Sequence, residues 1–176
     1  MLTITVPARE IYDERTNRFF TVKEQTLKLE HSLVSISKWE SKWEKSYLES
    51  NDKTDEEVID YIRCMTLTQN VDPNVYYCLT RDNVNAIANY INAKRSATYL
   101  PEQKEGRSSV RDKVTSELIY YWMVALQIPF EAEKWHLNRL LTLIQICNIK
   151  NNPGKKMSKS EILNRNRALN KARRKH

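Results

Sequence analysis

The stretch LKLEHSLVSISKWESKW, residues 27–43, contains the change of pattern that decides the fold class. At its start, Leu27 and Leu29 alternate with polar residues, as along a half-buried strand. From Ser32 onward, apolar residues recur at intervals of three and four, which is the spacing of an amphipathic helix. Leu27 and Leu29 therefore either form a short strand or lead into that helix. The stretch predicts a boundary between a β-rich N-terminal part and a helical remainder.

Two patterns before this boundary predict extended structure. Residues 2–6 alternate apolar and polar side chains, which indicates a half-buried strand. Residues 10–12 and 18–22 flank the polar run 13–17, an arrangement typical of a β-hairpin. We therefore expect residues 1–30 to be β-rich.

Helical patterns fill residues 31–149. The first covers residues 32–48, where Trp39 and Trp43 are four residues apart and share one face. Thr54 and Glu57 then have the spacing of a capping box, which predicts the start of a second helix. Further helices are predicted over residues 74–79, 83–93, 113–127 and 130–149. The side chains expected to face the core are Val58, Ile59, Ile62 and Met65; Val84, Ile87, Ala88 and Ile91; and Leu137, Leu140, Leu141, Ile144 and Cys147.

The pattern over residues 113–127 is the most apolar of the series. Apolar residues surround this segment almost completely, which predicts a central helix covered on most sides. Residues 94–111 before it are polar and are predicted to form the longest loop, while Pro129 lies near the start of the next helix, where proline is tolerated. We expect residues 1–149 to form a single globular domain of the α+β class, mainly α.

The positive charge of the chain is concentrated after this domain. The formal net charge is +7, and residues 150–176 carry ten basic residues against one acidic residue, Glu161. Asn-Asn-Pro-Gly at 151–154 predicts a break, and Ser158 with Glu161 has a second capping-box spacing. We therefore predict a basic C-terminal arm over residues 150–176, with a helix from about residue 159.

Several classes of protein and site are disfavoured by the composition. The cysteines Cys64, Cys78 and Cys147 are odd in number and far apart, so we expect reduced core thiols. The chain has no apolar run of about 18 residues, and its start lacks the basic and apolar regions of a signal peptide, so we expect neither a membrane span nor a leader. With two glycines and no metal-ligand spacing, no cofactor and no metal are predicted.

Two groups of residues could imitate catalytic sites. Glu131, Glu133 and His136 are close in sequence, but charges at this spacing are typical of a solvated helix face. Cys64 and His31 could form a nucleophile pair, although nothing in the sequence brings them together and a buried thiol is the more common case. We predict no catalytic residues and no enzymatic activity.

Two features are candidates for binding a partner. Trp39 and Trp43 are interpreted as packing residues, with a subunit contact as the alternative. The arm is interpreted as a helix that docks on an acidic protein surface, because no aromatic residue lies between its charges to stack on bases. Nonspecific nucleic-acid binding and a merely solvated terminus are the alternatives. The basic candidates are Lys155, Lys156, Lys159, Arg165, Arg167, Lys171, Arg173, Arg174 and Lys175.

Several motifs resemble small proteins encoded in the structural modules of tailed bacteriophages. They are HSLVSISKWESKWE (31–44), DYIRCMT (60–66), WHLNRLLTLI (135–144), KKMS (155–158) and NRALN (166–170). The likeness covers most of the chain and is greatest to proteins encoded near the tail tape-measure gene, which are commonly assigned as tail assembly chaperones. The motifs bring no catalytic residues with them.

The resemblance implies a non-enzymatic tail assembly protein, either a chaperone or a structural component of the tail or baseplate. The implied partners are the tape-measure protein or other tail components, and self-association into a homo-oligomer is left open. The implied location is the host cytoplasm during assembly, or the virion for a tail component. The alternative function is a nonspecific nucleic-acid-binding protein that uses the basic arm.

Overall fold

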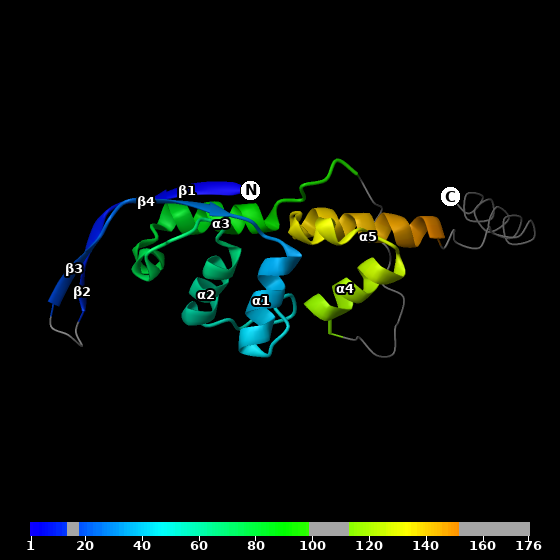
Figure 1. Cartoon of the computed structure of the whole chain (residues 1–176), viewed down its shortest axis with the longest axis horizontal. Helices are drawn as coiled ribbons and strands as arrows, with labels where there is room; N and C mark the ends of the chain where they lie inside the picture. The colour runs from blue at the N-terminus through cyan, green and yellow to red at the C-terminus, as the bar shows by residue number, and fades with distance from the viewer. Residues whose placement is uncertain (14–17, 99–112, 152–176) are drawn as a thin grey trace, which may run out of the picture. The chain divides into compact units, whose positions relative to one another are not determined.

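The computed structural model describes residues 1–13, 18–98 and 113–151 (Figure 1). The chain divides into a compact unit, Met1–Ile144, and a second unit that begins at Gln145, of which residues 145–151 are described. The fold is of the predicted class, mixed α+β and mainly helical. The predicted basic helix of the arm lies outside the described residues.

Four strands form two antiparallel pairs near the N-terminus. They are β1 (Leu2–Val6), β2 (Arg9–Asp13), β3 (Arg18–Val22) and β4 (Gln25–Leu29). β1 pairs with β4, where Ile4 lies opposite Leu27, and β2 pairs with β3. The predicted strand over residues 2–6 and the predicted hairpin are confirmed, and Leu27 and Leu29 belong to a strand. Both leucines are fully buried, as the alternating pattern requires.

Five α-helices and two 3-10 helices follow in the described residues. They are α1 (Leu33–Trp43), α2 (Asp55–Met65), η1 (Pro73–Cys78), α3 (Arg81–Asn92), α4 (Ser116–Ala125), η2 (Phe130–Lys134) and α5 (Leu137–Asn151). Ser32, Thr54 and Thr80 each close a capping box at the start of α1, α2 and α3. The predicted capping box of Thr54 and Glu57 is therefore confirmed. None of the described helices is long and apolar enough to cross a membrane.

The first helix is shorter than the predicted 32–48. α1 ends at Trp43 because Glu44 adopts a left-handed conformation, with φ of 52°. The chain then turns back, and the backbone N–H of Tyr47 donates a hydrogen bond of 2.8 Å to the Glu40 carboxylate. A local polar contact thus ends the helix at Trp43, although the apolar spacing predicted that it continues to residue 48.

The predicted buried faces of α2 and α3 are partly wrong. Ile62, Met65 and Ile87 are buried as expected, whereas Val58 and Val84 are exposed. Tyr61 of α2 and Tyr90 of α3 are also buried, although the sequence pattern did not predict them as core residues. Each tyrosine buries a large ring while its hydroxyl keeps a hydrogen-bond partner, so burial does not strand the polar group.

The prediction that residues 113–127 form a covered central helix is wrong. α4 packs against α1, and its buried residues are Ser116, Ile119 and Met123. Tyr121 is 65% exposed and Val124 is 60% exposed. Among the described residues, α4 therefore has a single buried face.

The predicted helix over residues 130–149 is broken into η2 and α5. Between them, His136 forms an isolated β-bridge with Ser32, and the N–H of Leu137 donates to the carbonyl oxygen of His31 at 2.7 Å. This pairing with a distant segment extends the chain at residues 135–136. Leu137, Leu140 and Ile144 are buried as predicted, whereas Leu141 and Cys147 are only partly buried.

Candidate functional site

Two buried histidines meet where the start of α1 contacts the start of α5. The rings of His31 and His136 are 5.2 Å apart, edge to face. Nδ1 of His31 lies 2.5 Å from the Tyr61 hydroxyl, and Nε2 of His136 lies 2.9 Å from the carbonyl oxygen of Tyr90. Because a carbonyl oxygen can only accept, the proton of a neutral His136 is on Nε2. His136 thus contacts the core and does not lie on a solvated helix face, contrary to the prediction.

Burial sets the charge state of this histidine pair. Together with a smaller effect of the neighbouring His136, it lowers the pKa of His31 from 6.5 to about 4. Burial also lowers the pKa of His136. Both imidazoles are therefore neutral at neutral pH, and neither is positioned as a solvent-exposed acid or base.

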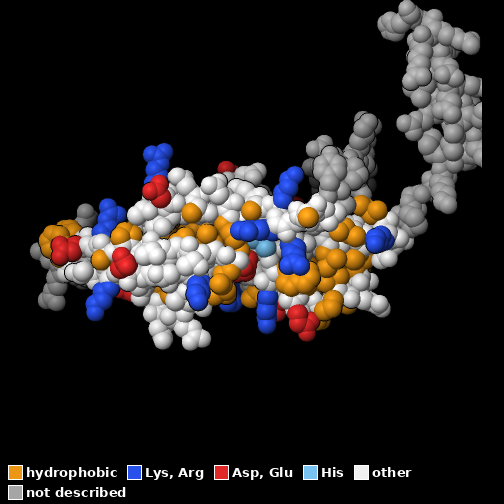
Figure 2. All heavy atoms as spheres, turned by 90° about the horizontal axis from the view of Figure 1, so that it is seen from above, with side chains coloured by type: hydrophobic (Ala, Val, Ile, Leu, Met, Phe, Trp, Pro, Cys, Tyr) orange, Lys and Arg blue, Asp and Glu red, His pale blue; other side chains and the backbone are white. Residues whose placement is uncertain are grey.

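A polar pocket of about 270 Å³ opens beside His136, and we call it the cationic pocket. It is lined by Met1, Glu30, Tyr90, Arg95, Lys134, Trp135, His136 and Arg139. The Arg95 guanidinium lies 4.7 Å from the centre of the Tyr90 ring, and that of Arg139 lies 4.3 Å from the Trp135 ring. Figure 2 shows a histidine on this face of the molecule with Lys and Arg side chains around it.

The positive charge of this pocket is not neutralised within the described residues. Glu30 is the single acidic residue of the lining. One of its carboxylate oxygens accepts from the Tyr90 hydroxyl at 2.7 Å, and the other is 2.7 Å from the Met1 amino group. In the described part of the chain, Arg95 and Arg139 have no carboxylate within 4.0 Å, nor has Lys134. The described lining of the pocket therefore carries an excess of positive charge.

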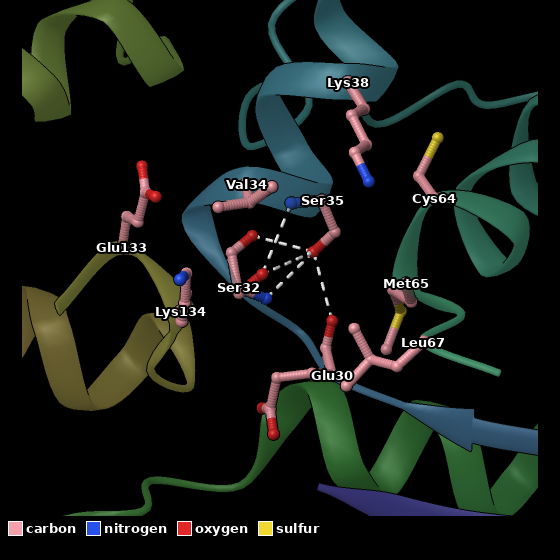
Figure 3. Close-up of a pocket in the computed structure, with 10 residues that line it drawn as sticks. All are labelled: Glu30, Ser32, Val34, Ser35, Lys38, Cys64, Met65, Leu67, Glu133 and Lys134. Carbon is pink, nitrogen blue, oxygen red and sulfur yellow. Dashed lines mark hydrogen bonds between the residues drawn. The ribbon is translucent and has the colours of Figure 1, made fainter. Parts of the chain in front are cut away.

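A second pocket, of about 280 Å³, shares Glu30 and Lys134 with the first and is shown in Figure 3. Its walls are mainly apolar, and Lys38 and Cys64 lie at one side. Burial and the charge of Asp60 raise the pKa of the Cys64 thiol. The thiol is thus protonated at neutral pH and is a poor nucleophile.

The two serines of the second pocket stabilise local structure. The Ser32 and Ser35 side chains form the capping box of α1, and the Ser35 hydroxyl donates to the Glu30 carbonyl oxygen at 3.1 Å. His31 is not among the residues that line this pocket. The structure therefore does not bring Cys64 and His31 together at this pocket as a nucleophile and its base.

The two tryptophans singled out in the sequence have different environments. Trp39 is fully buried, and its Nε1 donates to the Glu57 carbonyl oxygen at 2.8 Å. Trp43 is half-buried, and its Nε1 donates to the Asp60 carboxylate at 2.9 Å. Trp39 therefore packs inside the fold and is unavailable to a partner, while Trp43 presents one edge. The nine basic candidates of the arm all lie outside the described residues.

Helix α4 and the neighbouring η2 expose large apolar side chains. Phe130 of η2 is 56% exposed, in addition to Tyr121 and Val124 of α4. We call these three residues the α4 surface. The Phe130 and Tyr120 rings are 6.4 Å apart, and the Tyr120 hydroxyl donates to Glu133 at 2.9 Å, so η2 is linked to α4. Exposed apolar side chains that form a contiguous patch mark interaction sites.

The metal-ligating side chains and the cysteines form no cluster in the described residues. No group of three or more metal-ligating side chains occurs in the described parts of the chain. Cys78 is buried, whereas Cys64 and Cys147 are partly exposed, and all three are free thiols. The prediction of core thiols thus fits Cys78 best.

Sequence reasoning missed the cationic pocket. Trp135 and Arg139 are four residues apart, but Trp135 is extended and lies before the start of α5, so helical spacing does not predict their contact. The contribution of Arg95 could not be predicted either, because it depends on how α3 packs beside His136.

No protein-family model matches the chain, and no curated protein or solved structure matches it either.

Proposed function

We propose that this protein is a non-enzymatic tail assembly protein of a bacteriophage, which acts by binding another structural protein. The observation that carries the proposal is the α4 surface. α4 is apolar almost all round, yet in the described part of the chain one face of it is buried and Tyr121 and Val124 are largely exposed. A helix with this composition is normally covered, so we infer that a partner protein covers it.

A helical partner suits this surface. An amphipathic helix can place its apolar side chains against exposed aromatic and aliphatic groups such as Tyr121, Val124 and Phe130. A tape-measure protein is a long helical chain that is prone to aggregate before assembly, and it is the partner that the sequence resemblance implies. Binding would keep its apolar face out of water until the tail forms, in the host cytoplasm.

The test is co-expression with the tail proteins encoded beside this chain. We expect a soluble complex that contains the tape-measure protein, and a yield several-fold lower for Val124→Ser because an apolar contact is lost. Val58→Ser is the matched control, since Val58 is an exposed valine on α2. Equal yields from the two variants would contradict a role for the α4 surface.

Analysis of purified virions separates the two versions of the proposal. A chaperone is absent from the finished particle, whereas a tail or baseplate component is present in it. A chain that neither enters virions nor binds any tail protein would overturn the proposal.

The basic arm supports a second candidate, nonspecific nucleic-acid binding. Counterion release would then make the affinity for duplex DNA fall steeply as salt is raised. Removal of residues 154–176 should abolish the binding, because nine of the basic residues lie there. Affinity that is insensitive to salt, or that survives the truncation, would exclude this candidate.

A further inference from the structure

The two arginines of the cationic pocket are pre-positioned for a planar anion. The Arg95 and Arg139 guanidinium groups rest on the faces of Tyr90 and Trp135. Stacking restrains a guanidinium while its N–H groups, which lie in its plane, remain free to donate. Carboxylates match this geometry with two parallel hydrogen bonds.

Charge in and around the pocket favours an anion as well. Arg95, Lys134 and Arg139 line one space, and the one carboxylate among the described lining residues, that of Glu30, already contacts Tyr90 and Met1. His136 adds no positive charge at neutral pH, because burial keeps its pKa low. Three like charges in one pocket repel one another, so a bound anion would relieve the repulsion.

The geometry fits a protein carboxylate better than a nucleic acid. Single-stranded nucleic acids bind by stacking their bases on aromatic rings, and here both rings already carry a guanidinium on one face. A nucleic-acid backbone also needs cations spread along a track, whereas these three converge on a pocket of about 270 Å³. Trp135 adds an apolar wall beside the cations, a combination common at protein interfaces.

We infer that the cationic pocket binds an acidic segment of a partner protein, with adjacent carboxylates held by Arg95 and Arg139 and with Lys134 nearby. The inference rests on the proposed function in one respect, namely that the partner is a protein. It is independent of the α4 surface and of the arm.

The test uses the full chain and a readout at the pocket itself. The probe is a synthetic peptide with two adjacent glutamates flanked by leucines, followed by NMR of the Trp135 indole N–H and the arginine Nε–H groups. We expect saturable shifts of the Trp135, Arg95 and Arg139 signals. The same peptide with glutamines should leave them unchanged. Arg95→Gln and Arg139→Gln should each weaken binding about ten-fold, as expected for loss of a charge-assisted hydrogen bond.

The control variant is Lys23→Gln, which removes one exposed positive charge away from the pocket lining and should leave the affinity unchanged. Unaltered binding by Arg139→Gln, with its melting temperature retained, would overturn the inference. Equal or stronger shifts of the same signals by oligothymidylate or inorganic phosphate would overturn the assignment to a protein. If the peptide fails while the tape-measure protein still co-purifies through Val124, the inference fails and the proposed function survives.

Discussion

At the scale of single residues, the environments of the buried polar groups are the features that the sequence pattern did not predict. His31 is 2% exposed, and its ring contacts Tyr61 and His136. A lone histidine between a strand and a helix carried no sign of this environment in the sequence. The environment arises because α1, α2 and the start of α5 meet at one point.

The first prediction is that stability falls in mild acid because of His31. Its pKa is about 4 in the folded state and 6.5 in an unfolded chain, so the unfolded state binds more protons between these values. The stabilisation is complete above about pH 6.5 and is lost as the pH falls toward 4. We expect the free energy of unfolding in urea to drop by about 2 kcal/mol between about pH 7.5 and about pH 5. The lowered pKa of His136 acts in the same direction.

His31→Gln is the control for this prediction. It should reduce the drop between the two pH values, even if the variant is less stable at both. Glu57 and Asp60 do not contribute to the change in the free energy of unfolding between these two pH values. The hydrogen bond from Lys45 lowers the pKa of Glu57. Burial raises the pKa of Asp60, but the hydrogen bond from Lys42 outweighs this effect and lowers it overall. Both carboxyl groups therefore change the stability only below about pH 4.5. An unchanged pH dependence in the variant would contradict the assignment to His31.

At the scale of elements, local signals were predictable and non-local ones were not. The strand over residues 2–6 and the capping box at Thr54 follow from neighbouring residues alone, and both are confirmed. The break at residues 135–136 depends on a bridge to Ser32, a hundred residues away in the chain. The pockets were unpredictable for the same reason, because their linings combine several segments.

The second prediction concerns the link between α1 and α4. Glu40 of α1 is buried, and its two carboxylate oxygens accept from the backbone N–H groups of Tyr47 at 2.8 Å and Ser116 at 2.7 Å. Ser116 is the first residue of α4, where free N–H groups and the helix dipole favour a negative charge.

Replacing Glu40 by glutamine places an NH₂ group against one of these donors. We expect Glu40→Gln to lower the free energy of unfolding by about 2 kcal/mol, because a buried N–H loses its acceptor. Glu44→Gln, an exposed neighbour at the end of α1, should change it by less than about 0.5 kcal/mol. Chemical denaturation measures both, and similar values for the two variants would show that Glu40 does not fasten α4.

At the scale of the whole molecule, the residues that form the core and the residues that carry the excess positive charge lie in different parts of the sequence. The buried core lies in the unit Met1–Ile144, while nine of the ten basic residues of the arm follow Asn151. Residues 154–176 carry nine basic residues and one acidic residue, so their removal changes the formal net charge from +7 to −1.

The third prediction is that truncation after residue 153 changes the stability of the folded unit Met1–Ile144 only slightly. Leu140→Ala, in contrast, should lower that stability. Leu140 of α5 is fully buried, and its loss should cost about 2–5 kcal/mol, because the cavity cannot close completely. The truncation should shift the melting temperature far less, since no residue of the described core is removed. It should nevertheless abolish retention on a cation exchanger, because the remaining charge is slightly negative. A truncated chain that melts as early as Leu140→Ala would mean that the arm completes the core, and the arm would then be a structural element rather than a separate binding element.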